Sequence, residues 1–378
     1  MTKLLCVMLL VATLGLLCQA QIETIYTFNG SDGRIPSGNI VFDADGSLYG
    51  TTVYGGTLDL GTVYRLSPDG LGGWQQTGLY SFTNSADGMT PIAGLTLDPS
   101  GKIWGTAYGK SGPDCPPSCG SLFTFDGSSL MIVHTFLGGK DGGVPRSTPI
   151  FDSTGNLYRS TAYRGAKGYG TVYRIEPDGK KHILHAFGSD KYGADPSGNL
   201  VLGSDGTIYG ITQWAGGNDT GTIFRLVPGT KGYQLRVIHK FTAKEGRTAA
   251  GLNFANGMLY GTLPYNSGHQ CVGILYSLAT NSKGEWVETK LHKFCLKVDG
   301  RNPLFNPLMM PDGSFYGTTV QAVYKLSLVD GVWQPTRVIW TGEDEPWTGA
   351  LTLGPDGKLY GTTHSGGTGY GTVFSVTP

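Results

Sequence analysis

Beyond its first twenty residues the sequence has no long hydrophobic run, no basic run and no segment with a 3.6-residue apolar period. The first absence argues against a transmembrane segment in the rest of the chain. The second, together with a balance of 28 basic and 28 acidic residues, argues against nucleic acid or an anionic membrane surface as a partner. The third predicts almost no helix.

Recognisable catalytic motifs are missing as well. The chain contains no Gly-x-Ser-x-Gly elbow, no P-loop, no His-Glu-x-x-His and no spaced Cys-x-x-Cys set. Its glycine-rich loops do not open helices, so they are poor phosphate sites. We therefore expect no cofactor, and the sequence favours a protein without catalysis. Paired carboxylates for glycoside chemistry stay open, because their separation is a three-dimensional quantity.

The first twenty residues have the pattern of a secretory signal. A lysine precedes an apolar run over Leu4–Leu17, and small residues stand at positions −1 and −3 before Gln21. A lipid-anchored Cys18 is the alternative, although the residue before it is large for that purpose. We predict cleavage between Ala20 and Gln21, export to the periplasm or the cell exterior, and one domain over residues 21–378.

Glycine is abundant. It supplies 61 of 378 residues, about 16% and more than twice the usual share, interleaved with aromatic and β-branched residues. A Leu-Tyr-Gly-Thr-Thr phrase followed by Gly-Thr-Val-Phe recurs seven times, with its aromatic at Tyr49, Trp104, Tyr158, Tyr209, Tyr260, Tyr316 and Tyr360. A period of about 50 residues with four strand-like runs predicts a β-propeller.

The second unit shows the four strands most clearly, and we name them A to D in chain order. They are predicted at Ala93–Leu97, Lys102–Ala107, Gly120–Phe125 and Leu130–Phe136. A glycine follows strand A in every unit, where a tight A–B turn needs a positive φ.

Strand D contains a second marker in each unit, an aromatic residue or a histidine at Tyr26, Tyr80, His134, His185, His239, His292 and Trp340. The first of these precedes any strand A, whereas the seventh unit stops after its strand C at Pro378. We therefore predict that Ile22–Phe28 is the outer strand of the last blade. The fold class is all-β, a seven-bladed propeller of four-stranded antiparallel blades closed by its own first strand.

Four cysteines lie beyond the first twenty residues, and an oxidising compartment favours their pairing. Cys271 precedes strand C of the fifth unit and Cys295 ends its strand D, so they face each other on antiparallel neighbours and form one predicted disulfide. Cys115 and Cys119 bracket a short loop and form the second predicted pair, with free thiols as the alternative.

The recurring phrases resemble the GloVer tandem-repeat family of exported bacterial proteins. They stand here at Asp45–Thr52, Gly61–Gly70, Leu79–Phe82 and Asp87–Pro91, and the resemblance covers nearly all of residues 21–378. It implies export and a propeller-like fold, and it brings no established activity or catalytic residue. Two departures are Arg159-Ser160 in place of Gly-Thr, and a sixth unit with almost no loop between its strands B and C.

Seven histidines could indicate a metal site, but four of them occupy the same position on successive outer strands. Outer strands of different blades are expected to point away from one another, whereas metal ligands must converge at roughly 2 Å. We therefore predict no metal site, and His182 lies on an ordinary strand D. His269 and His364 fall at B–C loops, and a site shared by these two is the weaker alternative.

The B–C loops and the D–A connections open on the same face, because the strands alternate in direction. Residues just after strand B, with Arg159, form the predicted ligand-binding set: Tyr54, Tyr108, Tyr163, Trp214, Tyr265 and His364, with Gln321 at the short sixth loop. The D–A connections add carboxylates at Asp32, Asp87, Asp141, Glu245, Asp299 and Asp344. Aromatic faces rimmed with carboxylates suit a sugar or a planar ligand. The alternative is packing between blades and turn formation.

Arg159 replaces a glycine that the other six units keep, and two further basic residues lie nearby. We predict a local positive patch, with a head that reaches solvent as the structural alternative. The protein is thus expected to be a monomeric binding module for a small molecule, a glycan or a protein through the B–C/D–A face. The alternative is a lyase or glycoside-cleaving propeller that uses carboxylates and His364 or His269.

Overall fold

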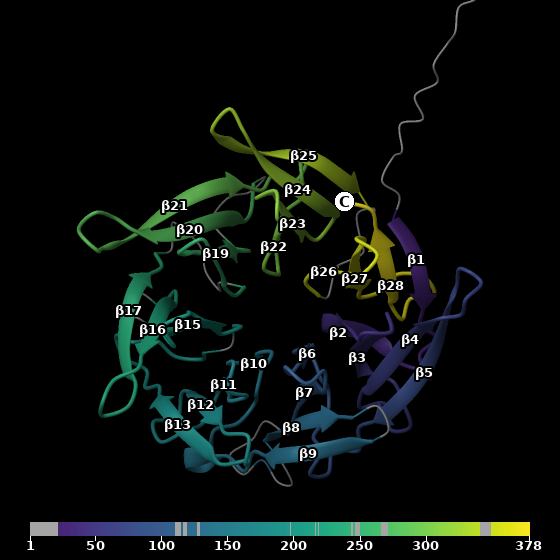
Figure 1. Cartoon of the computed structure of the whole chain (residues 1–378), viewed down its shortest axis with the longest axis horizontal. Helices are drawn as coiled ribbons and strands as arrows, with labels where there is room; N and C mark the ends of the chain where they lie inside the picture. Colours follow the sequence, from purple (N-terminus) through teal and green to yellow (C-terminus); the bar gives the residue numbers. More distant parts are fainter. Residues whose placement is uncertain are drawn as a thin grey trace, which may run out of the picture.

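The computed structural model describes residues 22–109, 115, 119–126, 129–196, 198–215, 217, 219–242, 245, 250–265, 271–340 and 349–378. It contains seven four-stranded antiparallel sheets arranged in a ring around a central axis (Figure 1). The predicted all-β seven-bladed propeller is confirmed. The one helical segment among these residues is a 3₁₀ turn at Gly139–Asp141, and no described helix has the length and apolarity needed to cross a membrane.

The first four blades follow one another along the chain. Blade 1 contains β2 (Arg34–Phe42), β3 (Leu48–Tyr54), β4 (Thr62–Pro68) and β5 (Trp74–Ser81). Blade 2 contains β6 (Leu95–Leu97), β7 (Ile103–Tyr108), β8 (Gly120–Phe125) and β9 (Leu130–Thr135). Blade 3 contains β10 (Ile150–Phe151), β11 (Leu157–Thr161), β12 (Thr171–Ile175) and β13 (Lys181–Ala186). Blade 4 contains β14 (Val201–Leu202), β15 (Ile208–Thr212), β16 (Thr222–Val227) and β17 (Gln234–Lys240).

The last three blades complete the ring. Blade 5 contains β18 (Asn253–Ala255), β19 (Met258–Leu263), β20 (Ile274–Thr280) and β21 (Trp286–Lys293). Blade 6 contains β22 (Leu308–Met309), β23 (Phe315–Thr318), β24 (Ala322–Val329) and β25 (Val332–Trp340). Blade 7 contains β26 (Thr352–Leu353), β27 (Leu359–Thr363), β28 (Thr372–Val376) and β1 (Ile22–Thr27).

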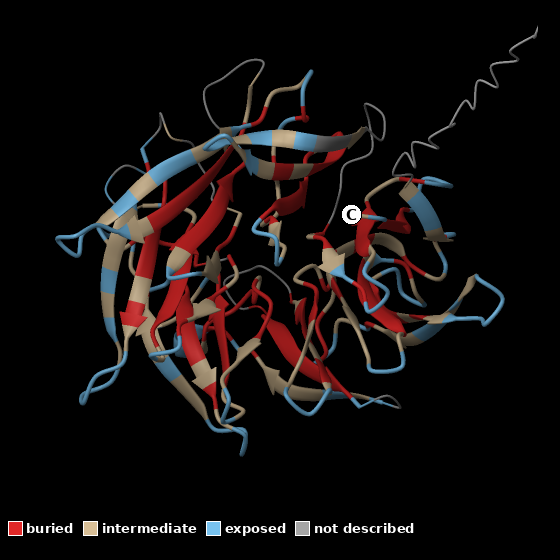
Figure 2. Cartoon of the chain, turned by 45° about the horizontal axis from the view of Figure 1, so that its top comes forward, coloured by how far each residue is buried: buried red, intermediate tan, exposed pale blue. Residues whose placement is uncertain are grey.

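Burial increases from the outer strand of each blade towards the two middle strands (Figure 2). Strands β15 and β28 are buried along their whole length, which matches their nearly continuous runs of apolar and small residues. Outer strands such as β5 mix exposed and half-buried positions, because one face packs on the next blade and the other meets solvent.

Two contacts explain why the repeated phrase has its sequence. Its last threonine hydrogen-bonds through Oγ1 to the threonine that opens strand C, at 2.7 Å for Thr52 and Thr62 and at 2.8–2.9 Å in blades 3, 4 and 7. Its glycine lies against the aromatic ring of strand C, so that a Cβ on Gly50 would come within 2.3 Å of Tyr64 Oη. The phrase is therefore a scaffold requirement.

Neighbouring blades are joined by a chain of aromatic rings. At six of the seven interfaces the phenylalanine after the outer strand packs on the ring of strand C in the next blade, as Phe136 does on Tyr173 at 5.6 Å and Phe187 does on Phe224 at 5.1 Å between ring centroids. The histidine or tyrosine two positions earlier packs edge-on against the same phenylalanine. Each such ring pair is worth about 0.5–1.5 kcal/mol beyond the area that it buries.

The closure of the ring follows the prediction. Strand β1 pairs antiparallel with β28, from Ile22 opposite Val376 to Thr27 opposite Thr372. Phe28 N donates a hydrogen bond to Gly371 O just beyond this ladder. The first described strand is therefore the outer strand of the last blade.

Both predicted disulfides are present, Cys115–Cys119 in blade 2 and Cys271–Cys295 in blade 5. The second links the residues before β20 to those after β21, as the repeat predicts. Disulfides persist in oxidising compartments, so the pair indicates an exported protein. The proposed signal sequence at residues 1–20 lies outside the described residues.

Candidate functional site

The B–C/D–A face is built by loops of adjacent blades that hold one another. Residues in the D–A connections adopt positive φ and donate backbone hydrogen bonds to the B–C loop of the preceding blade, as Val144 N does to Cys119 O (2.7 Å) and Asp195 N does to Tyr169 O (3.1 Å). The residue after strand B pairs with the D–A connection as well, so that Tyr163 faces Gly143 and Trp214 faces Ala194. The predicted aromatic residues thus stand on a fixed backbone.

Four of the six predicted ring residues present their side chains to solvent on this face. Their exposed fractions are 36% for Tyr54, 40% for Tyr163, 45% for Trp214 and 49% for Tyr265. Tyr108 and His364 are half-buried, and Gln321 at the short sixth loop is buried. Each of these four rings therefore keeps an accessible part on this face, while the rest of its surface is covered by its neighbours.

Arg146 stands between two of the predicted tyrosines. Its guanidinium carbon lies 5.7 Å from the ring centre of Tyr108 and 5.2 Å from that of Tyr163, both within the range of a cation–π contact. Its Nη1 lies 3.6 Å from Oδ2 of Asp195, which is buried and directly follows the residue paired with Trp214. Burial alone would lower the pKa of Arg146, but Tyr108, Asp195 and Tyr163 raise it.

Arg159 does not reach the surface, so both the positive patch and the solvent-reaching head predicted for it are wrong. Its side chain has no exposed area. Nη2 donates to Thr106 Oγ1 of blade 2 at 2.7 Å, whereas Nε and Nη1 have no hydrogen-bond partner in the described part of the chain. Burial lowers its pKa to about 10, so it stays protonated at neutral pH and adds a positive charge at the interface of blades 2 and 3.

The carboxylates of the D–A connections do not rim the face. Tyr80 Oη donates to Asp87 Oδ2 at 3.0 Å, His134 Nε2 lies 3.1 Å from both carboxylate oxygens of Asp141, and His292 Nε2 contacts Asp299. Asp87 and Asp299 are buried. These carboxylates fix the D–A connection to the outer strand of their own blade, and Asp344 lies outside the described residues.

The channel along the axis contains a separate cavity of about 790 Å³. Its lining combines apolar side chains such as Leu200, Phe254 and Met309 with amide side chains, among them Asn39, Asn199 and Asn253. Thr148 lines the same cavity two residues after Arg146, so one segment of blade 3 serves both the channel and the B–C/D–A face. None of the predicted ring residues lines this cavity.

Sequence reasoning missed Arg146 and Asp195. The signal was present, because the residue after the proline of the D–A connection is uncharged in the other units that have this proline: Ser37, Ile92, Ser197, Leu304 and Trp347. The departure at Arg146 was hidden because the repeat was aligned on strands B and D. His269 lies outside the described residues, so the two-histidine alternative stays a prediction.

The geometry suits recognition of a flat polar ligand. Blades 2 to 4 place two tyrosines with a guanidinium between them, a buried carboxylate and an exposed indole on neighbouring connections. Aromatic faces stack on the apolar face of a sugar ring, and an arginine donates hydrogen bonds to its hydroxyl or carboxylate groups. Blade 1 has a related but more exposed arrangement, in which Arg34 lies 4.7 Å from the Tyr54 ring centre and pairs with Asp59.

Comparison with known proteins supports the repeat and the fold. The sequence matches the family described as Gloeobacter/Verrucomicrobia repeat over residues 16–191 and 114–325. No curated protein matches the sequence.

The solved structures similar to this chain have low sequence identity to it. A putative 6-phosphogluconolactonase from Bacteroides uniformis is 16% identical, with a TM-score of 0.55 over 85% of this chain and 89% of that chain. The extracellular domain of a putative hybrid two-component system from B. thetaiotaomicron is 11% identical, with a TM-score of 0.58 over 95% of this chain and 42% of that chain. A surface component of the type-IX secretion system of Porphyromonas gingivalis is 13% identical, with a TM-score of 0.58 over 93% of this chain and 47% of that one. At these identities the likeness concerns the fold alone.

Proposed function

The chain belongs to the Gloeobacter/Verrucomicrobia repeat family, and we propose that this exported seven-bladed propeller is a carbohydrate-binding module. The observation that carries the proposal is Arg146 between Tyr108 and Tyr163, paired with the buried Asp195 beside the exposed Trp214. The ligand stacks on Trp214 and Tyr163, and the partly exposed Arg146, which pairs with the buried Asp195, bonds its polar groups.

The charge of this cluster selects among saccharides. Arg146 and Arg159 contribute two positive charges against the single carboxylate of Asp195. A saccharide that carries carboxylates therefore binds more tightly than a neutral one, since the Arg146 guanidinium can bond a carboxylate through two N–H groups. Salt weakens this preference.

The test is calorimetric titration of the folded protein with soluble neutral oligosaccharides and with oligosaccharides of uronic acids. We expect R146A and W214A to lower the affinity for the uronic-acid ligand at least about tenfold, which is 1.4 kcal/mol, with the melting temperature nearly unchanged. R34A is the matched control, because it removes the corresponding arginine–tyrosine contact in blade 1 and should leave the affinity unchanged.

Three outcomes count against the proposal. Absence of heat with every saccharide at millimolar concentration would reject carbohydrate as the ligand class. An equal loss of affinity in R34A and R146A would reject the assignment of the site to blades 2 to 4. Tighter binding of neutral sugars than of uronic acids would reject the electrostatic part.

A further inference from the structure

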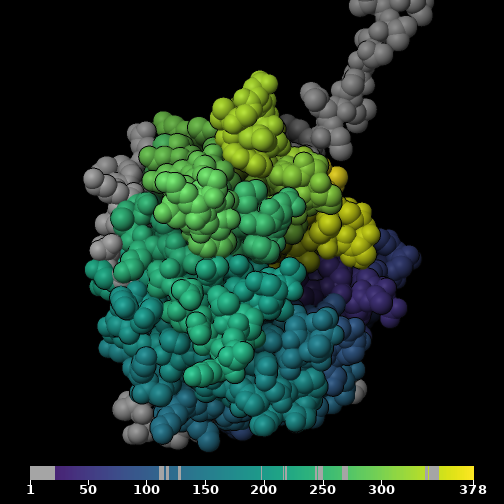
Figure 3. Space-filling view, turned by 60° about the vertical axis from the view of Figure 1, so that its left-hand side comes forward, coloured from purple at the N-terminus to yellow at the C-terminus, as the bar shows by residue number. Residues whose placement is uncertain are grey.

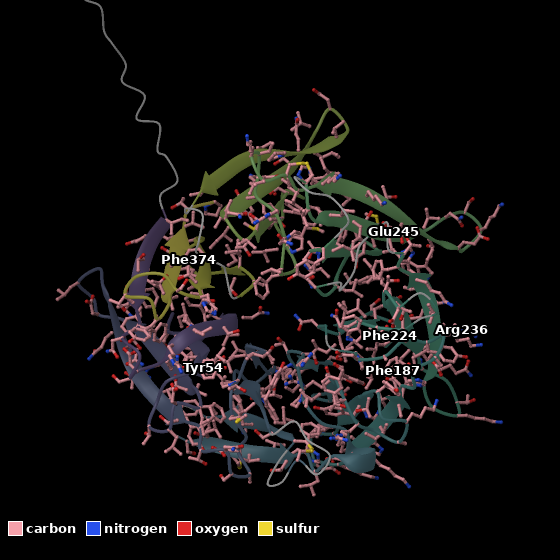
Figure 4. All side chains as sticks on the ribbon, turned by 180° about the vertical axis from the view of Figure 1, so that it is seen from behind. Tyr54, Phe187, Phe224, Arg236, Glu245 and Phe374 are labelled. Atoms are coloured by element: carbon pink, nitrogen blue, oxygen red, sulfur yellow. A yellow bond between two sulfur atoms is a disulfide. The ribbon has the colours of Figure 1, made fainter. Side chains whose placement is uncertain are left out.

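A histidine and two carboxylates from neighbouring blades converge on the outer side of the ring. His239 on β17, Glu245 in the connection that follows it and Glu288 on β21 each offer one atom, and these atoms lie within 4.8 Å of one another. His239 Nε2 lies 2.8 Å from Glu288 Oε2 and 3.9 Å from Glu245 Oε2. Figure 4 shows Glu245 near blades 4 and 5, across the ring from Tyr54, and Figure 3 views the molecule from the side of these blades.

Glu288 is buried without the hydrogen bonds that a buried carboxylate needs. Its side chain is 8% exposed, and neither of its oxygens accepts a hydrogen bond from any residue that the structure describes. An uncompensated buried carboxylate costs several kcal/mol. Its contact with His239 at 2.8 Å balances at most one of the two negative charges in the cluster, because Glu245 adds the second.

At the interface between blades 2 and 3, a lysine occupies the position that corresponds to Glu288. Glu288 pairs with Leu278 two residues after Tyr276, and Lys181 pairs with Ile175 two residues after Tyr173, so the two side chains are equivalent in register. Lys181 Nζ lies 2.6 Å from Asp141 Oδ1, beside His134, and 4.4 Å from the ring centres of Phe136 and Tyr173. A positive charge therefore occupies this place in blades 2 and 3.

The corresponding place in blades 4 and 5 has the same surroundings without the lysine. Phe241 and Tyr276 pack against each other there, at 5.7 Å between ring centroids, as Phe136 and Tyr173 do. Glu288 adds a carboxylate where Lys181 adds an ammonium group. The sequence argument that outer strands of different blades hold their side chains apart is therefore wrong for His239 and Glu288.

We propose that His239, Glu245 and Glu288 bind a divalent first-row transition-metal ion of the Zn²⁺ class, which clips blades 4 and 5 together. One imidazole nitrogen and two carboxylates are ligands that such ions accept, whereas Ca²⁺ and Mg²⁺ prefer oxygen alone. Glu245 Oε2 also accepts hydrogen bonds from Thr242 N (2.6 Å) and Oγ1 (2.8 Å), which orient this ligand. Water or an outside ligand completes the coordination.

The test uses the untagged chain after removal of metal with a chelator. Titration with ZnCl₂, followed by calorimetry, should show one equivalent bound and a rise in melting temperature that grows with metal concentration. The visible spectrum of bound Co²⁺ should show coordination by nitrogen and oxygen. We expect E288Q and H239Q to lower the Zn²⁺ affinity at least about 100-fold, because loss of a direct ligand costs at least as much as loss of a supporting residue.

Two variants separate metal binding from folding. E288K copies the lysine of the other interface, so it should fold, keep its near-UV circular dichroism and bind no Zn²⁺ at this site. H182Q removes another surface histidine–carboxylate pair, in which His182 Nε2 lies 3.2 Å from Glu176 Oε1, and should leave Zn²⁺ binding unchanged.

The proposal is overturned if the wild-type chain binds no Zn²⁺, or if folded E288Q and E288K both keep wild-type affinity. A loss of binding in H182Q would place the metal elsewhere. Tighter binding of Ca²⁺ or Mg²⁺ than of Zn²⁺ would reject the transition-metal class. None of these measurements depends on the carbohydrate site of blades 2 to 4.

Discussion

The interface of blades 2 and 3 and the interface of blades 4 and 5 place opposite charges at one position of the same scaffold. In the first, Lys181 and His134 hold the pKa of Asp141 at about 2, although burial would raise it. In the second, Glu288 meets His239 and Glu245 with no described lysine or arginine among its partners. The repeated fold determines where these side chains meet, and single substitutions decide whether a lysine pairs with a carboxylate there or a histidine meets two carboxylates.

The interface of blades 3 and 4 gives a third version. His185 has the same position as His134 and His239, but no described carboxylate pairs with it at ion-pair distance. Burial, and then the charge of Lys167, lower its pKa to about 4. The strand D position that holds Lys181 in blade 3 and Glu288 in blade 5 holds Leu235, opposite Leu226, in blade 4. The scaffold therefore accepts a cationic, an acidic or an apolar side chain there.

The largest effect is expected from making the first interface acidic. K181E places a second carboxylate beside Asp141. It also removes the ammonium group that contacts the rings of Phe136 and Tyr173. We expect the free energy of unfolding to fall by about 3–5 kcal/mol, as when one partner of a buried pair is lost. Urea unfolding measures it. K180E makes the same charge change at an exposed neighbour, and an equal loss there would contradict the assignment.

The two interfaces also differ at one position of strand B, which holds the buried Arg159 in blade 3 and Gly261 in blade 5. A second substitution tests this difference. R159M keeps the length of the side chain and removes a buried charge that makes one described hydrogen bond. We expect stability to stay equal or to rise by up to about 2 kcal/mol. R174M, which removes a partly exposed ion pair with Glu176, is the control and should cost at most about 1 kcal/mol. A loss above 2 kcal/mol in R159M would contradict this account.

Copying the lysine into the second interface should have a smaller effect. In metal-free buffer, E288K replaces the repulsion between Glu288 and Glu245 with attraction and places an ammonium group near Phe241 and Tyr276. We expect a gain of about 1 kcal/mol in urea unfolding, in the range of a single cation–π contact or ion pair. Equal destabilisation in E288K and E288Q would show that Glu288 already has a partner that stabilises it.

The smallest effect concerns pH and His185. Its pKa is about 4 in the folded chain and about 6.5 in the unfolded one, so the unfolded state binds more protons between these values. The contribution of His185 is therefore complete above pH 6.5 and is lost as the pH falls towards 4. H185F should reduce the pH dependence of the free energy of unfolding by about 1–2 kcal/mol over this range, less than the full shift because the ring is partly exposed. Parallel pH curves for the two proteins would contradict it.

Most of the fold could be predicted from the sequence because the scaffold contacts repeat. The threonine pair, the glycine against the strand C ring and the phenylalanine between blades each recur, so seven copies average out local ambiguity. The closure by β1 and the Cys271–Cys295 pair followed from the same alignment, whereas the Cys115–Cys119 pair was predicted from the short loop between the two residues. Four of the aromatic residues predicted on the B–C/D–A face are exposed there.

The parts that could not be predicted depend on single residues and on distances between blades. Arg159 was expected in a positive patch at the surface because Arg164 and Lys167 lie nearby in the sequence, but its side chain turns towards Thr106 of the preceding blade. The meeting of His239 with Glu288 was not visible, because a β-bulge between Leu275 and Tyr276 shifts the register of β21 against β20. Repetition reveals the scaffold, whereas a site is formed by residues that differ from it.

The pairing of β1 with β28 has a consequence for the order of assembly. During synthesis Ile22–Thr27 emerges first, and its partner Thr372–Val376 emerges more than 340 residues later. Blade 7 therefore waits for the end of the repeat region, although the entropy of closing so long a loop grows only slowly with length. Until then the first blade lacks the neighbour that β1 provides for Tyr64 through Phe28. In a partly synthesised chain the first and last completed blades each lack a neighbour, so their apolar faces stay uncovered. The ring closes only after the seventh blade has been synthesised.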